Sequence, residues 1–338
     1  MTKILIIYTG GTIGMVNNPH TGALIPFDFE QIQQNVPELA RLNYDLDVYS
    51  FNPILDSSNM DPQIWAKIAG LINERYEIYD GFVILHGSDT MAYTASALSF
   101  MLKNLGKPVV LTGSQLPIGE IRTDAKENLI TALEIAATKN NGQAMVPEVC
   151  IYFDYQLFRG NRSIKYNSEK FEAFRSPNYP KLAEAGVNLS FFNNYISQQP
   201  VSALRLETNF NTNISVLKLY PGISENAVKA ITRSSAEAIV METFGSGNTT
   251  TAAWFTDSLQ EAVDAGKLIV DISQCQGGSV ELGKYETSKK LQQMGIVSGF
   301  DMTFEATVTK MMYLLGQGLT YKEVSSLMEQ SLRGELTA

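Results

Sequence analysis

Two turns rich in hydroxyl side chains are the part of this sequence best suited to chemistry. One carries Thr12 and follows the apolar residues 5–7; the other carries Ser88 and Asp89 and follows the apolar residues 83–85. Apolar runs bounded by glycine are typical of buried parallel strands, and α/β proteins place their chemistry in the turns after such strands. The hydroxyls in both turns predict an oxygen nucleophile rather than one built on histidine or cysteine.

A hydroxyl nucleophile needs a general base within hydrogen-bond distance, because it loses its proton as it attacks. His86 lies inside a strand-end motif, where a structural role is more common. A lysine whose pKa is lowered can serve as the base instead, with a tyrosine as a relay. Asp89 is suited to orient such a group or to bind a substrate amine, although a plain helix N-cap would explain the same residue.

The common cofactor motifs have no match in the chain. No cysteine pair has zinc spacing and the histidines are His20 and His86, which argues against a His/Cys metal site, whereas a carboxylate-only Mg²⁺ or Ca²⁺ site stays open. Residues 10–14 lack the Gly-x-Gly-x-x-Gly spacing of dinucleotide-binding loops, and there is no Gly-Lys-Ser/Thr phosphate loop. We therefore predict no metal and no cofactor.

The composition is that of an ordinary globular protein, since 44% of the 338 residues are hydrophobic and 18% are charged. The net charge of -9 argues against a nucleic-acid surface, which needs clustered lysine and arginine. The first residues lack the features of a signal peptide, and no apolar stretch approaches the ~20 residues that span a bilayer. Cys150 and Cys275 lie far apart, so no disulfide is expected. These features predict a cytoplasmic protein without nucleic-acid or membrane partners.

Strand-like and helical patterns alternate along the chain, which predicts parallel-rich sheets flanked by helices. We expect an α/β protein with a larger N-terminal domain at 1–190, a linker at 191–211 and a smaller C-terminal domain at 212–338. The expected strands include residues 82–86, 109–111, 149–153, 214–219, 238–241 and 268–272. The expected helices start at Asp61-Pro62 and Ser224 and cover residues 89–106, 124–139, 303–315 and 320–332.

Five motifs occur in an order that resembles the bacterial-type L-asparaginase family, in its cytoplasmic type I branch. They are Tyr8-Thr9-Gly10-Gly11-Thr12-Ile13-Gly14, Asp56-Ser57-Ser58-Asn59-Met60, His86-Gly87-Ser88-Asp89-Thr90-Met91, Thr112-Gly113-Ser114-Gln115 and Gly160-Asn161-Arg162-Ser163-Ile164-Lys165. The resemblance covers essentially the whole chain, including residues 245–248 and 299–303. It implies a two-domain asparaginase/glutaminase-like fold, hydrolysis of L-asparagine to L-aspartate and ammonia, and a homodimer or homotetramer.

The resemblance also implies roles for individual residues. Thr12 would attack the side-chain amide and form an acyl-enzyme, Lys165 would accept a proton through Ser88, and Asp89 would also hold the α-ammonium of the substrate. Backbone N–H groups near Gly11 and Ser88 would stabilise the oxyanion. The implied substrate-binding set is Asp56, Ser57, Ser58, Ser88, Asp89 and Ser114, with Ser57 and Ser58 on the α-carboxylate.

The chain departs from the family pattern in three respects. Ser88 stands where threonine is usual, which keeps the hydroxyl but loses the methyl group that restricts its rotamer. No tyrosine occurs between residues 15 and 30, and Tyr285 would supply the missing catalytic phenol unless it is an ordinary surface or packing residue.

The third departure concerns regulation. Glu242 replaces the arginine of an effector site found in some type I members, and would repel an effector carboxylate. Cys275 matches that site, whereas Ile164 replaces a hydroxyl residue. We predict that allosteric activation by asparagine is absent or altered.

Two other kinds of protein are compatible with these motifs. One is a related amidase, either a glutaminase-asparaginase of broader specificity or the amidase-like subunit of a tRNA-dependent amidotransferase, which usually carries an extra N-terminal region. The other is a non-catalytic amino-acid-binding sensor. Thr12, Ser88, Asp89 and Lys165 together count against the sensor, because a pure binder has no need of a lysine beside a second hydroxyl.

Overall fold

Two separate units make up the chain in this computed structural model, which describes residues 1–17, 24–26, 36–284 and 286–337. They are Met1–Thr208 and Asn209–Ala338. Each has its own sheet, and the larger unit is the N-terminal one. The predicted two-domain α/β architecture with a smaller C-terminal domain is therefore confirmed.

An eight-stranded sheet forms the centre of the first unit among the described residues, with strand order β15-β14-β11-β10-β7-β5-β1-β4. The strands from β10 to β4 run parallel, and β11, β14 and β15 extend the sheet with antiparallel pairings. Their bounds are β1 Thr2–Gly10, β4 Tyr44–Leu55, β5 Gly81–Leu85, β7 Val109–Thr112, β10 Val149–Phe153, β11 Gln156–Arg159, β14 Ala183–Ala185 and β15 Leu189–Phe191.

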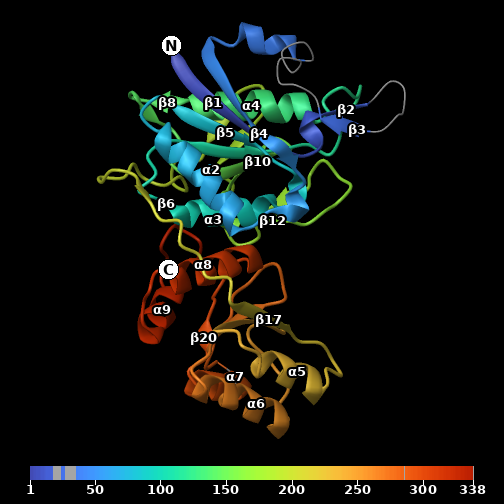
Figure 1. The fold of residues 1–338 in the computed structure, drawn as a ribbon, viewed down its shortest axis with the longest axis vertical. Helices are drawn as coiled ribbons and strands as arrows, with labels where there is room; N and C mark the ends of the chain where they lie inside the picture. Colours follow the sequence, from blue (N-terminus) through green and yellow to red (C-terminus); the bar gives the residue numbers. More distant parts are fainter. Residues whose placement is uncertain (18–23, 27–35, 285, 338) are drawn as a thin grey trace. The chain divides into compact units, whose positions relative to one another are not determined.

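Helices cover both faces of this sheet. In Figure 1, α4 (Ala125–Ala137) lies on one side, and α2 (Pro62–Glu74) and α3 (Met91–Met101) lie on the other. Helix α2 begins as its sequence predicts, because the Asp61 side chain accepts a hydrogen bond from the Ile64 backbone and proline occupies the first helical position. All five residues of β5 are buried, which explains their unbroken apolar run.

Short two-stranded pairs and single 3₁₀ turns connect these elements. The described part of the chain contains four such pairs. They are β2 (Met15–Asn17) with β3 (Leu24–Pro26), β6 (Leu102–Lys103) with β16 (Arg205–Leu206), β8 (Lys139–Asn140) with β9 (Gln143–Ala144), and β12 (Ile164–Lys165) with β13 (Phe174–Arg175). The 3₁₀ turns are η1 (Thr12–Gly14), η2 (Pro37–Arg41), η3 (Ser57–Asn59), η4 (Ser88–Thr90) and η5 (Gly160–Arg162). The helix expected at 89–106 is shorter than predicted, because η4 precedes it and Leu102 leaves it to pair with Leu206.

The second unit is built on a parallel sheet of order β17-β18-β19-β20. Its core joins strand residues such as Ile239 and Ile269 to helix residues such as Val228 and Phe255. The strands are β17 Ile214–Lys218, β18 Ala238–Thr243, β19 Leu268–Ser273 and β20 Val297–Ser298; the helices are α5 Glu225–Thr232, α6 Ala253–Asp264, α7 Glu286–Gln293, α8 Phe304–Gly316 and α9 Tyr321–Met328. Among the described residues, none of the helices combines the length and the hydrophobicity that spanning a bilayer requires.

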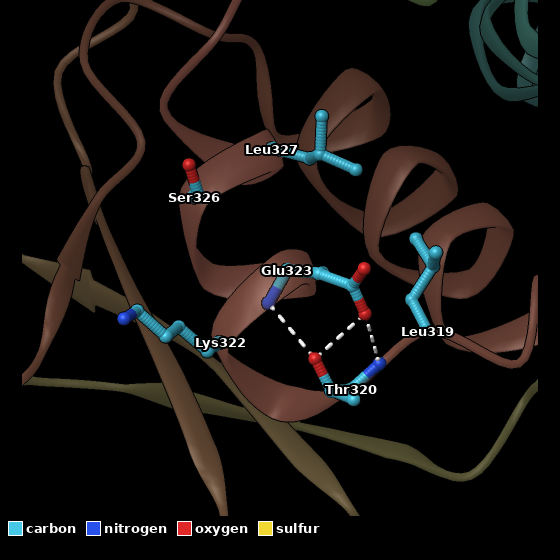
Figure 2. Close-up of a pocket in the computed structure, with 6 residues that line it drawn as sticks. All are labelled: Leu319, Thr320, Lys322, Glu323, Ser326 and Leu327. Atoms are coloured by element: carbon cyan, nitrogen blue, oxygen red, sulfur yellow. Dashed lines mark hydrogen bonds between the residues drawn. The ribbon is translucent and has the colours of Figure 1, made fainter.

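A surface hollow lies over the first turn of α9 (Figure 2). Its polar groups already bond to one another: the Thr320 hydroxyl accepts from the Glu323 backbone, and the Glu323 carboxylate accepts from the Thr320 backbone at 2.8 Å. This reciprocal arrangement is a capping box, which fixes the start of a helix. We therefore assign these residues a structural role.

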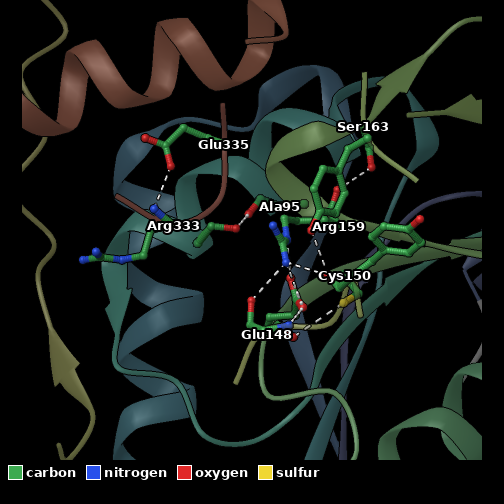
Figure 3. A network of polar contacts seen from close by, with 11 residues as sticks. Ala95, Glu148, Cys150, Arg159, Ser163, Arg333 and Glu335 are labelled. Carbon is green, nitrogen blue, oxygen red and sulfur yellow. Dashed lines mark hydrogen bonds and ion pairs between the residues drawn. The ribbon is translucent and has the colours of Figure 1, made fainter. Parts of the chain in front are cut away.

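A fully buried ion pair holds the end of the chain to α8. Lys310 Nζ lies 2.6 Å from a Glu335 carboxylate oxygen, and both side chains are 0% exposed. Lys310 also donates to the backbone carbonyls of Met328 and Gln330. Glu335 accepts from the backbone N–H of Arg333 (Figure 3). With these hydrogen bonds the buried charges are compensated locally.

Candidate active site

A pocket of about 420 Å³ lies where the chain leaves β1, β4 and β5. These strands are parallel neighbours, so their carboxyl ends meet at one edge of the sheet. Three 3₁₀ turns, η1, η3 and η4, follow the strands and form the walls. The lining residues are Gly11, Thr12, Met15, Ile54, Leu55, Asp56, Ser57, Gly87, Ser88 and Asp89.

Glycines let the three turns pack closely against one another. Gly11 has φ +92°, and a Cβ there would lie 2.6 Å from the Gly87 nitrogen. At Gly87 a Cβ would lie 2.5 Å from the Ser57 hydroxyl. At Gly11 a Cβ would press on backbone atoms and the φ is positive, so glycine is required there. At Gly87 a Cβ would instead displace the Ser57 side chain. The close approach brings the hydroxyls of Thr12, Ser57 and Ser88 to one pocket.

Lys165 joins this site from a distant part of the sequence. Its Nζ lies 2.8 Å from Ser88 Oγ and 2.6 Å from Asp89 Oδ1. The Lys165 side chain is 14% exposed, whereas that of Asp89 is 68% exposed. The amine is thus shielded and within proton-transfer distance of a hydroxyl, while the carboxylate remains open to a ligand.

A second buried ion pair anchors the segment that carries Lys165. Arg159 Nε donates to Glu148 at 2.6 Å (Figure 3), and the same guanidinium donates to the Tyr195 carbonyl. The Ser163 hydroxyl then donates back to the Arg159 carbonyl at 2.7 Å. Lys165 follows two residues later in β12, which pairs with β13. This anchoring restricts where the Lys165 amine can lie.

His86 directly precedes the lining residue Gly87 and is completely buried. The Trp65 indole donates to Thr94 Oγ1 at 3.0 Å, and the Thr94 hydroxyl lies 2.9 Å from His86 Nε2. Because the Gly87 carbonyl can only accept, the ring proton is on Nδ1, and the neutral Nε2 accepts from Thr94. His86 Nδ1–H then donates to the Gly87 carbonyl at 2.6 Å. Burial lowers the pKa of His86 to about 4, so its imidazole is neutral around pH 7. The imidazole does not line the pocket, which agrees with the structural role expected for it.

The remaining predicted binding residues are placed unequally. The Asp56 carboxylate accepts from the Ser58 backbone at 2.9 Å, and this hydrogen bond lowers the pKa of Asp56. Asp56 and Ser57 line the pocket, whereas Ser58 is exposed and is not part of the lining. Ser114 is buried, and its hydroxyl donates to the Leu116 carbonyl at 2.6 Å. The binding roles of Asp56, Ser57, Ser58 and Ser114 all stay predictions.

Two further predicted residues belong to the second unit. Tyr285 lies outside the described residues, and its role as a catalytic phenol stays a prediction. Glu242 is in β18, and its carboxylate pairs with Lys218 of the neighbouring strand at 3.2 Å. Cys275 is an exposed free thiol.

The apolar part of the lining was not predicted from the sequence. Ile54 and Leu55 end β4, and Met15 follows η1. Reading residues 44–55 as a strand would have found the first two, because a strand parallel to β1 ends at the same edge of the sheet.

Comparisons with known proteins cover both units. Residues 3–197 match the family model "Asparaginase, N-terminal", and residues 213–328 match "Glutaminase/Asparaginase C-terminal domain". L-asparaginase 1 of Escherichia coli K12 is 42% identical over 336 residues, which cover 99% of this chain and 98% of that protein. The 60 kDa lysophospholipase of Mus musculus is 40% identical over 99% of this chain, but over 62% of its own length. The crystal structure of L-asparaginase I from Vibrio cholerae has a TM-score of 0.91 and 41% identity, and covers 100% of this chain and 99% of its own. The chain therefore belongs to the asparaginase family.

Proposed function

We propose that the protein is an L-asparaginase, which hydrolyses L-asparagine to L-aspartate and ammonia. The observation that carries this proposal is the Lys165 amine, 2.8 Å from the Ser88 hydroxyl, at the edge of a pocket that Thr12 also lines. The full-length similarity to L-asparaginase 1 of E. coli supports the same substrate.

In the proposed reaction, Thr12 Oγ1 forms a bond to the side-chain amide carbon of asparagine. The proton of the Thr12 hydroxyl passes to the leaving nitrogen by way of Ser88 and Lys165, and the C–N bond breaks to release ammonia. Water then attacks the ester on Thr12, and the same pair removes a proton from that water. Aspartate leaves, and Thr12 regains its proton. Backbone N–H groups of the Gly11 and Ser88 turns would stabilise the oxyanion in both steps.

The proposed binding mode uses the charges of a free amino acid. Asp89 is an exposed carboxylate of the pocket beside the Lys165 amine, and its charge suits it to bind an α-ammonium group. Ser57, with Ser58, would bind the α-carboxylate, and Asp56 and Ser114 complete the predicted set. Tyr285 would contribute the phenol that residues 15–30 do not provide.

The alternatives have less support. An amino-acid sensor does not need a shielded lysine beside a second hydroxyl. A glutaminase-asparaginase would use the same groups, and the substrate panel below distinguishes it. The mouse lysophospholipase extends well beyond the aligned region, and the Asp89–Lys165 pair fits a zwitterionic amino acid better than an acyl chain.

Assembly, location and regulation are part of the proposal. We propose a cytoplasmic homodimer or homotetramer, which light scattering on the purified protein would distinguish. Glu242, already paired with Lys218, would repel an effector carboxylate, so we expect no strong sigmoidal response to asparagine. Strong sigmoidality that is lost in Glu242→Ala would contradict this expectation.

The decisive experiment measures ammonia released from L-asparagine, L-glutamine and D-asparagine. We expect L-asparagine to be preferred, and Thr12→Val to lower kcat by at least about a thousandfold because the nucleophile is gone. Circular dichroism should show an intact fold, since valine matches the shape of threonine. Turnover near the wild-type rate in Thr12→Val would refute the nucleophile assignment, and no ammonia from L-asparagine with the wild-type protein would refute the function.

A further inference from the structure

Tyr8 reaches from β1 to the far end of the turn that carries Thr12. Its ring is 2% exposed and packs in the core with Ile6 and Ile13. Its hydroxyl donates to the Gly14 carbonyl at 2.9 Å. The strand before the turn thus bonds directly to the last residue of the turn, six positions along the chain.

Gly14 leaves the space that the Tyr8 ring occupies. It is absent from the glycines that have positive φ, so its backbone conformation does not require glycine. A Cβ at Gly14 would lie 2.2 Å from both Cζ and the hydroxyl oxygen of Tyr8. The space is filled by the Tyr8 ring, and the two residues form a matched pair.

Thr12 is the half-buried residue of a turn that is held on several sides. The Gly14 N–H donates to the Gly11 carbonyl at 3.2 Å and closes the turn. Gly11 packs on Gly87, and the Ile13 side chain is completely buried. The Tyr8 hydroxyl adds the contact that fixes the carbonyl end.

We propose that Tyr8 is a positioning residue, whose hydroxyl holds the Thr12–Gly14 turn so that Thr12 Oγ1 faces the substrate carbon and the Ser88–Lys165 pair. This inference rests on the proposed asparaginase function. Tyr8 does not act as a proton carrier, because its proton is bonded to the Gly14 carbonyl. Burial also raises the pKa of Tyr8 to about 12, which keeps the phenol protonated.

The first test is Tyr8→Phe, which keeps the ring and removes the hydroxyl. We expect kcat to fall about tenfold with KM within about twofold of wild type, because a misplaced nucleophile slows chemistry more than it weakens binding. Tyr152→Phe is the matched control: Tyr152 is fully buried in the same core, and its hydroxyl donates to Glu127 rather than to the turn. Its kcat should stay within about twofold of wild type. An unchanged kcat in Tyr8→Phe, or an equal loss in Tyr152→Phe, would overturn the inference.

The second test separates positioning from folding. Gly14→Ala should destabilise the protein by its clash with the Tyr8 ring, and Tyr8→Ala should relieve that clash in the double variant. The double variant should thus be more stable than additivity predicts, yet keep a low kcat because the hydroxyl is absent. Additive losses of stability, or wild-type kcat in the double variant, would contradict the matched pair.

The third test does not depend on activity. Hydrogen exchange at the backbone amides of residues 12–15 should be faster in Tyr8→Phe than in wild type or Tyr152→Phe. Unchanged exchange there would refute the anchor, whatever the reaction. If wild-type protein released no ammonia from asparagine, the proposed function would fail alone, and the exchange result would still decide the role of the Tyr8 hydroxyl.

Discussion

Acid should destabilise this protein through one buried imidazole, that of His86. Burial lowers the pKa of His86 from 6.5 to about 4. Below pH 6.5 the unfolded chain therefore binds a proton that the folded chain does not bind until about pH 4, so the free energy of unfolding falls as the pH falls through this window. At roughly 1.4 kcal/mol per pKa unit, the full effect is about 3 kcal/mol, of which about 2 kcal/mol is reached by pH 5.

The perturbation that exposes this effect is His86→Gln, which removes the titrating group. Urea unfolding of wild type and variant from about pH 7.5 to about pH 5 gives the free energy of unfolding of each. Wild type should lose about 2 kcal/mol more than the variant across this range, although the variant starts out less stable because the bonds to Thr94 and Gly87 are disturbed.

Comparing the two proteins cancels the carboxyl groups, which titrate in both. The same neutral imidazole implies that the pH profile of kcat has no limb that belongs to His86 above pH 5. Parallel stability curves for wild type and His86→Gln would refute the reasoning, because they would show that His86 titrates alike in the folded and unfolded states.

Two further substitutions test the charged groups. Lys165→Arg should lower kcat by at least about a hundredfold, because a guanidinium does not give up its proton. The surface variant Lys181→Arg is the control and should leave steady-state ammonia release unchanged. A near-normal kcat in Lys165→Arg would exclude Lys165 as the proton acceptor. Lys310→Met should lower the free energy of unfolding by about 3–5 kcal/mol, because it leaves the buried Glu335 carboxylate without its partner. Adding Glu335→Gln should restore part of the lost stability. Additive losses in urea unfolding would show that the two side chains are not coupled.

The sequence was most informative where one local pattern determines the structure. The apolar run before Thr12 and the one before Ser88 both form buried strands, and both hydroxyls line one pocket. β4 was missed because it is the edge strand of the sheet: Phe51 is its one buried residue, and Asp45, Asp47 and Ser50 interrupt any apolar run. Its end supplies Ile54 and Leu55 to the pocket, so the apolar lining was missed together with the strand.

Contacts between distant segments could not be derived from local patterns. α3 ends at Met101 because Leu102 pairs with Leu206, about a hundred residues later. The resemblance implied that Lys165 acts through Ser88, but their 2.8 Å separation depends on how the segment after Arg159 is anchored. The fit of Tyr8 to Gly14 likewise appears only in three dimensions, since either residue alone is ordinary in a strand or a turn.

The contacts of Gly11 with Gly87, and of Gly87 with Ser57, determine which substitutions the pocket tolerates during evolution. A side chain at Gly11 would meet the Gly87 backbone and disrupt both turns, and a side chain at Gly87 would displace that of Ser57. The side chains of Thr12 and Asp89, by contrast, extend into the pocket and can be exchanged while the turns stay in place. Single substitutions at Thr12 or Asp89 should therefore change catalysis or binding without unfolding the turns, whereas a side chain at Gly11 should disturb the fold. In a saturation mutagenesis library, loss of activity and loss of folding should separate cleanly between these two neighbouring sets of residues.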